Sequence, residues 1–422
     1  MKPLAQTLTL RPAVLAVTVL LVTAGAVGAQ NPSGTEFRVN TYTTGTQRFG
    51  SIAANEGYLF FVTWESAGQD GSQYGVFGQR YEGFTPAPLG GEFQINTYTT
   101  SDQSSPEVAS DPAGHFVVVW QSAGQDGDGL SVFGQRYSSA GVPLGGEFRV
   151  NTFTTLAQGF ADVAANAGGF MVVWQSAGQD GSGYGVFGQR YSSTGTPLGG
   201  EFRVNTYTTG AQRAPAVAVN SGGFVVVWES FDQDANGYGI FGQRYASTGT
   251  PLGGEFRVNT YTTGNQRSPA VDGPIGEFAV VWQSDGQDGS SDGVFGQRYA
   301  STGTPAGPEF SVNTYTTSSQ SSPALSVDAV HQIITVLWQS DLQDGSDMGI
   351  YSRKFLGGFP SDEEIQVNDH TAGPQTGPGM AFGGWPRWIS PWTSPQDPDG
   401  SLGVYAMMWY DLPVELQTFT VE

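Results

Sequence analysis

A phrase of about 54 residues recurs seven times along this chain of 422 residues, and this repetition constrains the fold more than any other feature. A regular period of this length indicates one supersecondary unit per repeat, because such a unit needs its neighbours to bury its apolar surface. The phrase EFRVNTYTT and its variants begin at Glu36, Glu92, Glu147, Glu201, Glu255, Glu309 and, in the weaker form EIQVN, Glu364.

Three further phrases recur in step with the first. The tryptophan of GGFVVVWQS stands at Trp64, Trp120, Trp174, Trp228, Trp282, Trp338 and Trp392. The aspartate of the Gln-Asp pair stands at Asp70, Asp126, Asp180, Asp234, Asp288, Asp344 and Asp397. The arginine of VFGQRY stands at Arg80, Arg136, Arg190, Arg244, Arg298 and Arg353, and the seventh copy has lost it.

Each copy contains four β signals. In the fourth copy they are Pro215–Val219, Phe224–Trp228, Ile240–Tyr245 and Glu255–Asn259, separated by polar, Gly-rich turns. Helical periodicity is absent from the repeat. Four antiparallel strands repeated seven times predict an all-β fold, a seven-bladed β-propeller over residues 36–411.

The closure of the ring has two possible donors. Residues 36–40, the first EFRVN, precede the first full hairpin and find a partner only if they complete the last blade. The C-terminal Leu416–Val421 competes for the same edge, so 412–422 is either a tail or the closing strand. Residues 30–35 are predicted to be a short linker.

Repetition itself favours structural roles for these side chains, because a catalytic site needs only one copy of each residue. We expect the tryptophans to pack between blades. A partly buried arginine needs the repeated aspartate or a carbonyl as its partner. The aspartate is expected to lock its loop by accepting backbone N–H groups.

The repeat phrases GGFVVVWQS, GQDGSGYGVFGQRY and EFRVNTYTT resemble a repeat of secreted and surface-attached bacterial proteins, most of them uncharacterised. The resemblance covers residues 36 to about 355. It implies an extracellular β-repeat protein and no particular activity.

Residues 1–29 have the pattern of a secretory signal peptide: Lys2 and Arg11, an apolar run over 13–22, and small residues ending at Ala29. A single membrane anchor is the alternative, although the apolar run is short for a span of ~20 residues. We therefore expect export to the periplasm, the cell surface or the medium, with no membrane span in the mature chain. Cleavage after Ala29 removes two bases and changes the formal net charge from −21 to −23.

Composition excludes several classes of function. The absence of cysteine excludes a disulfide scaffold, a Cys-ligated zinc site and a thiol nucleophile. The acidic balance argues against nucleic acid as a partner, because phosphate binding requires a basic surface. We expect a monomer whose partner is an extracellular protein or a glycan.

Calcium is the sharpest chemical hypothesis. Asp232, Asp234 and Asn236 follow the D-x-[DN]-x-[DN]-G opening of oxygen-rich calcium loops, with Gly237 at the turn. The acidic ligand expected at the twelfth position is missing, because Gln243 stands there. A hydrogen-bonded polar loop is the alternative, so calcium is a possible cofactor.

A unique site must use residues that do not repeat, and the divergent last copy contains Trp385, Arg387 and Trp388. We interpret them as a ligand surface for a glycan or protein, or else as packing at the closure of the ring. No catalytic motif is present, and His115, His331 and His370 are scattered.

In a blade, the loop between the second and third strands opens on the same side as the link to the next blade. This face is expected to be the functional one. It would carry the Gln-Asp loops and a second ring of glutamines at Gln47, Gln103, Gln158, Gln212, Gln266, Gln320 and Gln375.

The leading prediction is a non-enzymatic exported binding or scaffold module. The alternatives are a secreted carbohydrate-active enzyme, which needs unrepeated carboxylates near the axis, and a surface structural or adhesive protein.

Overall fold

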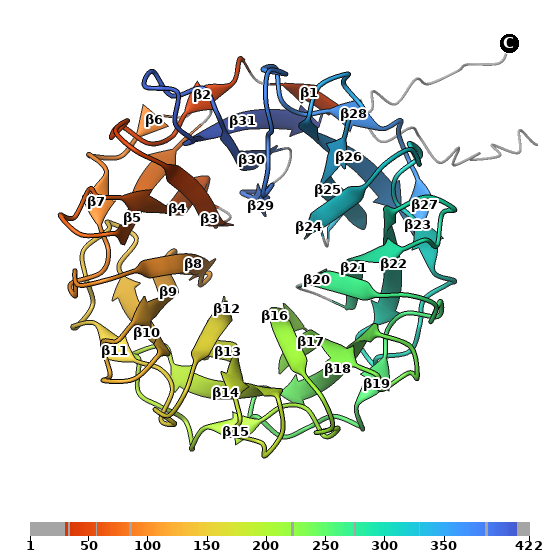
Figure 1. The fold of residues 1–422 in the computed structure, drawn as a ribbon, viewed down its shortest axis with the longest axis horizontal. Coiled ribbons are helices and arrows are strands. Elements are labelled where there is room, and N and C mark those ends of the chain that lie inside the picture. The colour runs from red at the N-terminus through yellow and green to blue at the C-terminus, as the bar shows by residue number, and fades with distance from the viewer. Residues whose placement is uncertain are drawn as a thin grey trace, which may run out of the picture.

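The computed structural model describes residues 30–411 except 33, 56, 84–86, 221–222, 274–275, 329 and 385–386. Seven antiparallel sheets surround one axis, as Figure 1 shows. The described residues contain strands and turns but no helix, and hence none long and apolar enough to cross a membrane. The predicted all-β, seven-bladed propeller is therefore confirmed, whereas the predicted signal peptide 1–29 and tail 412–422 lie outside the described residues.

Each blade takes its strands in chain order from the axis outward. Blade 1 contains β3 (Gln47–Ala54), β4 (Leu59–Ala67), β5 (Tyr74–Glu82), β6 (Ala87–Pro88) and β7 (Phe93–Gln94). Blade 2 contains β8 (Gln103–Ser110), β9 (Phe116–Ala123), β10 (Leu130–Tyr137) and β11 (Phe148–Arg149). Blade 3 contains β12 (Gln158–Asn166), β13 (Gly169–Ala177), β14 (Tyr184–Ser192) and β15 (Phe202–Arg203). Blade 4 contains β16 (Gln212–Asn220), β17 (Gly223–Phe231), β18 (Tyr238–Ala246) and β19 (Phe256–Arg257).

The remaining three blades follow the same plan. Blade 5 contains β20 (Gln266–Asp272), β21 (Glu277–Asp285), β22 (Asp292–Ala300) and β23 (Phe310–Ser311). Blade 6 contains β24 (Gln320–Asp328), β25 (Ile333–Asp341), β26 (Met348–Leu356), β27 (Phe359–Pro360) and β28 (Ile365–Gln366). Blade 7 contains β29 (Ala381–Phe382), β30 (Arg387–Ser394) and β31 (Gly403–Asp411), joined by β1 (Gln30–Pro32) and β2 (Phe37–Arg38).

The hydrophobic core lies between neighbouring blades, which explains why the second strand of each blade is apolar on both faces. In β17 every residue but the last is buried. One core cluster joins Val119 of blade 2 to Val163 and Trp174 of blade 3, and the equivalent clusters join the other pairs. All seven repeated tryptophans are fully buried, which confirms that they pack between blades.

The N-terminal strands close the ring. β2 pairs with β31, with Phe37 opposite Ala406, so the first EFRVN supplies the outer strand of blade 7. β1 extends the same edge, with Gln30 opposite Asp411. Residues 30–32 are thus a strand rather than part of the predicted linker, because the free edge of β31 offers them unpaired backbone groups. The competing segment Leu416–Val421 lies outside the described residues.

One repeated position was assigned wrongly from the sequence. Lys354 lies opposite Thr335 in the register of blade 6, as Arg298 lies opposite Ala279 in blade 5. Lys354 therefore occupies the repeated arginine position, and Arg353 corresponds to the preceding glutamine. Burial lowers the pKa of the Lys354 ammonium to about 8, because desolvation disfavours its charge.

Candidate functional site

The repeated aspartates lock their loops, as predicted. In blade 4, Asp234 Oδ1 accepts the Asn236 N–H at 3.4 Å, and Oδ2 accepts the Asn259 side-chain amide at 3.4 Å. In blade 1, Asp70 Oδ1 accepts the Ser72 N–H at 3.0 Å. In blades 1 and 4 both oxygens of the repeated carboxylate therefore serve the loop and the adjoining outer strand.

Four of the repeated arginines, Arg80, Arg136, Arg190 and Arg244, tie their blade to the next one. Arg136 of blade 2 donates to the carbonyls of Thr194 (2.6 Å) and Ser193 (2.5 Å), which lie in the outer turn of blade 3. Arg80 donates to the Ser139 carbonyl at 2.7 Å in the same manner. Of the two predicted partners, the carbonyl is the one used, because the arginine lies at the opposite end of the blade from the repeated aspartate.

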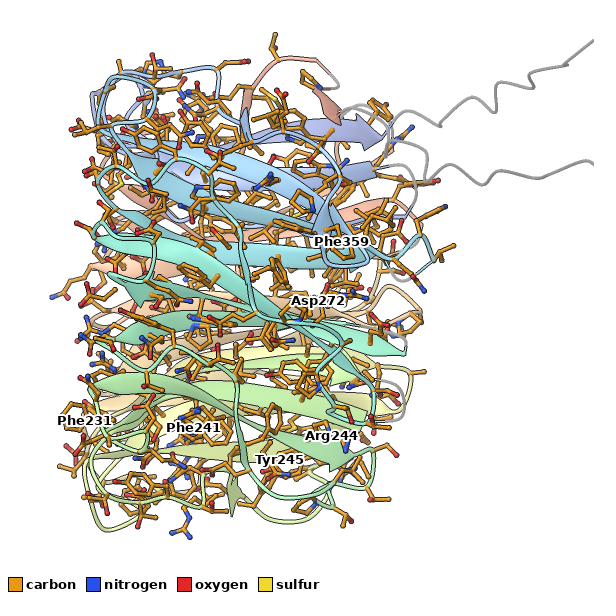
Figure 2. The ribbon with its side chains drawn as sticks, turned by 90° about the vertical axis from the view of Figure 1, so that its right-hand side faces the viewer. Phe231, Phe241, Arg244, Tyr245, Asp272 and Phe359 are labelled. Carbon is orange, nitrogen blue, oxygen red and sulfur yellow. The ribbon has the colours of Figure 1, made fainter. Side chains whose placement is uncertain are left out.

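We call the face with the second-to-third-strand loops the loop face, and the opposite face, with the hairpins and outer turns, the turn face. Figure 2 views the ring from its side and places Phe231 at the loop face and Arg244 toward the turn face. The glutamines expected to line the loop face are internal. Gln103 is fully buried and accepts the Asn96 side-chain amide at 3.2 Å.

The glutamine of the Gln-Asp pair is also used within the ring. Gln125 donates to Glu147 Oε1 at 2.5 Å, and Glu147 Oε2 accepts the Thr97 N–H at 2.7 Å. Gln125 and Glu147 therefore bond within blade 2, and Glu147 joins that blade to the segment that follows β7 of blade 1. In the described part of the chain these polar groups are used internally.

The candidate calcium residues lie on one loop of blade 4. Asp232 has a left-handed backbone with φ of +61°, and Asp234 is already engaged by Asn236 and Asn259. Within the described ranges, no three acidic or histidine side chains gather closely enough to hold a metal ion. The loop geometry thus matches the hydrogen-bonded alternative.

Two of the predicted ligand residues of blade 7 lie in the interior, and Trp385 lies outside the described residues. The Trp388 ring is 1% exposed and stacks on Trp409 with centroids 5.0 Å apart. The Arg387 guanidinium lies over the rings of Tyr58 and Tyr410, at 5.2 and 4.6 Å. This placement does not agree with a ligand surface at Trp388 and Arg387, because β30 is covered on both faces and neither side chain presents a free face.

A different set of unrepeated residues lies on the loop face. Leu156, Phe160 and Phe231 are 52%, 56% and 43% exposed. Leu156 and Phe160 have φ of +65° and +48°, a backbone region that costs large L-residues ~1–2 kcal/mol. Most other copies have smaller or polar residues there: Gly45, Ser101, Gly210, Gly264, Ser318 and Gly373 in place of Leu156; Ser105, Ala214, Ser268, Ser322 and Gly377, but Phe49 in blade 1, in place of Phe160; Ala67, Ala123, Ala177, Asp285 and Asp341 in place of Phe231.

These side chains extend across blades 3 and 4. A Cβ built on Gly178 would lie 3.1 Å from Leu156 Cδ1, and one built on Gly183 at the other end of that loop would lie 3.2 Å from the Gly210 carbonyl. A Cβ built on Gly210 would in turn lie 3.1 Å from Phe231 Cδ1. A single loop therefore separates Leu156 from Phe231.

Two arginines border this surface at Tyr238. The Phe231 and Tyr238 rings meet edge to face at 5.1 Å, and the guanidinium groups of Arg213 and Arg267 lie 4.1 and 5.4 Å from the Tyr238 centroid. We call Leu156, Phe160, Phe231, Tyr238, Arg213 and Arg267 the loop-face patch.

Arg267 differs from its equivalents. Arg48 and Arg213 pair with Glu65 and Glu229 on the adjacent strand, at 3.2 and 2.8 Å. Gln283 stands at that place beside Arg267. None of the described residues accepts a hydrogen bond from the Arg267 guanidinium, and its Nε is buried without a partner. Its Nη donors, which are not buried, are therefore the ones that a ligand can reach.

Among the carboxyl groups on the innermost strands, Asp162 and Glu107 interact with each other. Asp162 accepts the N–H groups of Val163 and Val217, both at 2.7 Å, and so joins blades 3 and 4. Burial raises its pKa to about 6. Burial, followed by the charge of Asp162, raises the pKa of Glu107 well above its usual range, while a hydrogen bond with the Ser51 side chain acts against this shift.

No protein-family model and no curated protein matches the chain. Among solved structures, it is similar to a protein of unknown function from Dyadobacter fermentans, with a TM-score of 0.52 and 10% identity over 91% of this chain and 99% of that one. The β-propeller domain of the trilobed protease from Pyrococcus furiosus has a TM-score of 0.49 and 6% identity, over 90% and 100% of the two chains.

An α-L-arabinanase from Penicillium chrysogenum, solved with arabinobiose, has a TM-score of 0.44 and 14% identity, over 77% and 99% of the two chains. The similarity to the Dyadobacter fermentans protein supports the propeller fold alone, because such low identity carries no information about activity.

Proposed function

We propose that this protein is an exported, non-enzymatic binding module that holds a protein partner on its loop-face patch. The observation that carries the proposal is Arg267, whose guanidinium has no acceptor among the described residues and lies over Tyr238 beside the exposed Phe231. Aromatic residues and arginine are the side chains that dominate binding energy at protein interfaces.

The strained backbone of Leu156 and Phe160 supports the same surface. Large apolar side chains in left-handed positions cost folding free energy, and they persist where function requires them. Their exposed side chains add apolar area on blade 3, while the two arginines lie beside Phe231 at Tyr238. A partner with an apolar contact surface and a carboxylate for Arg267 matches this arrangement.

The test uses substitutions that restore the residues of other copies. The triple variant Leu156→Gly, Phe160→Ser, Phe231→Ala removes the apolar part of the patch and keeps the fold, because other blades carry these residues. Val142→Thr is the matched control: Val142 is an exposed apolar residue of an outer turn, and Thr196, Thr250 and Thr304 occupy its position elsewhere.

Four immobilised proteins, the wild type, the triple variant, Arg267→Gln and Val142→Thr, are exposed to the same extracellular and envelope extracts. The retained proteins are quantified by mass spectrometry. We expect at least one protein to be retained by wild type and Val142→Thr and lost from the triple variant and from Arg267→Gln. Identical retention by all four would refute the proposal. Binding of a glycan that depends on the same residues would assign a glycan rather than a protein to the patch.

A secreted carbohydrate-active enzyme is the second candidate, and the neighbouring carboxyl groups of Glu107 and Asp162 favour it. An acid with a raised pKa beside a second carboxyl group is the arrangement that glycosidases use. Hydrolysis of a polysaccharide panel that Glu107→Gln abolishes would support the enzyme; equal release of sugar by wild type and variant would reject it.

A further inference from the structure

A cavity of about 250 Å³ opens between blades 5 and 6 on the turn face, away from the loop-face patch. Its apolar walls are formed by Phe278 and Ala279 of β21, Val327 of β24 and Ile334 of β25, and Gln332 adds a polar side chain. An ion pair borders it: Arg298 Nη2 donates to Glu277 Oε2 at 2.5 Å. The cavity therefore combines an apolar interior with one charged pair.

The same crevice exists between blades 2 and 3 but holds only about 20 Å³. The two crevices are equivalent by strand register, because Val117 lies opposite Arg136 as Ala279 lies opposite Arg298. The cavity between blades 5 and 6 is thus larger than the equivalent crevice between blades 2 and 3.

Two changes account for the added volume. Ala279 is the smallest residue at its position, where the other five of the first six copies carry Phe61, Val117, Met171, Val225 and Thr335. The outer turn of blade 6 is also one residue shorter, with Phe355 paired to Pro360, whereas Tyr191 pairs with Pro197 in blade 3.

The shorter turn changes the hydrogen bonding of the repeated arginine. Arg136 donates to two carbonyls of the longer turn in blade 3, at 2.6 and 2.5 Å. Arg298 donates to no carbonyl within the described residues and pairs with Glu277 of its own blade instead. Its side chain is 13% exposed and the Glu277 side chain 43% exposed, so solvent reaches both partners.

Asp272 holds the inner wall of the cavity in place. Its carboxylate accepts the N–H groups of Gly273 and Val327, each at 2.8 Å, and so ties β24 to blade 5. Figure 2 shows Asp272 on the side of the ring that faces the viewer. The other blades carry Ala or Ser at this position, so this bond is specific to the blade pair with the large cavity.

We propose that this cavity binds an apolar α-amino acid through its carboxylate, either as the free amino acid or as the C-terminal residue of a peptide. The guanidinium of Arg298 has five N–H donors and spends one on Glu277, so the others can bind a carboxylate. Glu277 accepts the ligand's ammonium or amide N–H. The cavity lies just below the range of ~300–1,000 Å³ that holds larger ligands, which suits a single apolar side chain.

Calorimetric titration tests the chemistry with four probes: L-leucine, the dipeptide Gly-Leu, leucinamide, which lacks the carboxylate, and 4-methylpentanoate, which lacks the nitrogen. We expect saturable binding of L-leucine, of Gly-Leu or of both, and none of leucinamide. Binding of L-leucine alone identifies a free amino acid, and binding of Gly-Leu alone identifies a peptide terminus. Leucinamide binding as tightly as L-leucine, or no saturation by either carboxylate up to about 10 mM, would overturn the proposal.

Substitutions in the cavity test whether the ligand binds there. Ala279→Met introduces the residue of blade 3 and fills the cavity, while Val225→Met makes an equivalent addition between blades 4 and 5. We expect Ala279→Met and Arg298→Gln to weaken binding about tenfold or more and Val225→Met to leave it unchanged. Thermal melting verifies folding, and Glu277→Gln provides a second rim variant if Ala279→Met does not fold. Unchanged binding in a folded Ala279→Met or in Arg298→Gln would contradict this location.

Discussion

Asn40 is the residue on which closure of the ring can be tested most directly. Its side-chain amide donates to the Tyr42 carbonyl at 2.8 Å, to Gln47 Oε1 at 3.2 Å and to Asp397 Oδ2 at 3.1 Å. Its Oδ1 accepts the Val404 N–H at 2.8 Å. The last two contacts join the N-terminal segment to blade 7, more than 350 residues away in the chain.

The substitution Asn40→Ala has a matched control in Asn205→Ala. Asn205 makes the same four contacts, to Tyr207, Gln212, Asp180 and Val186, but all of them lie within blades 3 and 4. Each variant loses several hydrogen bonds and leaves buried groups unpaired, which amounts to ~3–5 kcal/mol of unfolding free energy. The chemical loss is equal in the two variants, and only the position in the topology differs.

We expect the two variants to unfold at similar urea concentrations but to differ in hydrogen exchange. In Asn40→Ala, amides of 37–47 and of β31 should exchange ~10²–10³-fold faster, because the lost hydrogen bonds lower the free energy needed to open the ring closure locally. In Asn205→Ala the faster exchange should be confined to β14 and its neighbours. Mass spectrometry of exchanged peptides measures both. Unchanged exchange at β31 in Asn40→Ala, or equal opening of the termini in Asn205→Ala, would refute the reasoning.

Three further predictions concern stability. The folded-state pKa of Asp162, about 6, lies above its ordinary value of 3.8, so the folded protein holds this proton more tightly than the unfolded chain. The free energy of unfolding should therefore fall by up to ~3 kcal/mol as pH rises from about 4 to 6. Chemical denaturation across this range should show a smaller fall in Asp162→Ala, and an identical slope in the variant would contradict the assignment. Leu156→Gly should raise the melting temperature, because Gly relieves the strain of the left-handed backbone by ~1 kcal/mol. Leu198→Gly is the control at an exposed leucine. A melting temperature of Leu156→Gly below that of the wild type would show instead that Leu156 stabilises the fold. Adding calcium to metal-free protein should leave the melting temperature unchanged, because Asp234 already accepts bonds from Asn236 and Asn259; a saturable rise that Asp232→Ala abolishes would restore the calcium hypothesis.

Predictions from the sequence failed at positions whose environment is set by residues on neighbouring strands. For Trp388 the sequence left a ligand surface and packing at the ring closure both open, and its burial against Trp409 matches the packing alternative. The loop-face patch could have been found by the reverse comparison, since Leu156, Phe160 and Phe231 are large where most other copies are small. The unpaired state of Arg267 was not visible, because it depends on Gln283 on the neighbouring strand.

The sequence by itself determined the class of fold, the number of blades and the structural nature of the repeated tryptophans, arginines and aspartates. These features follow from the local periodicity of each copy and from the recurrence of the same residues at the same places in successive copies, both of which can be read from the sequence. The tertiary structure alone decided which terminus closes the ring, which glutamines are buried, and where two equivalent crevices differ in volume. Those outcomes depend on contacts between residues far apart in the chain, such as Asn40 with Asp397, and on small differences in side-chain volume and turn length that act only once neighbouring blades are packed together.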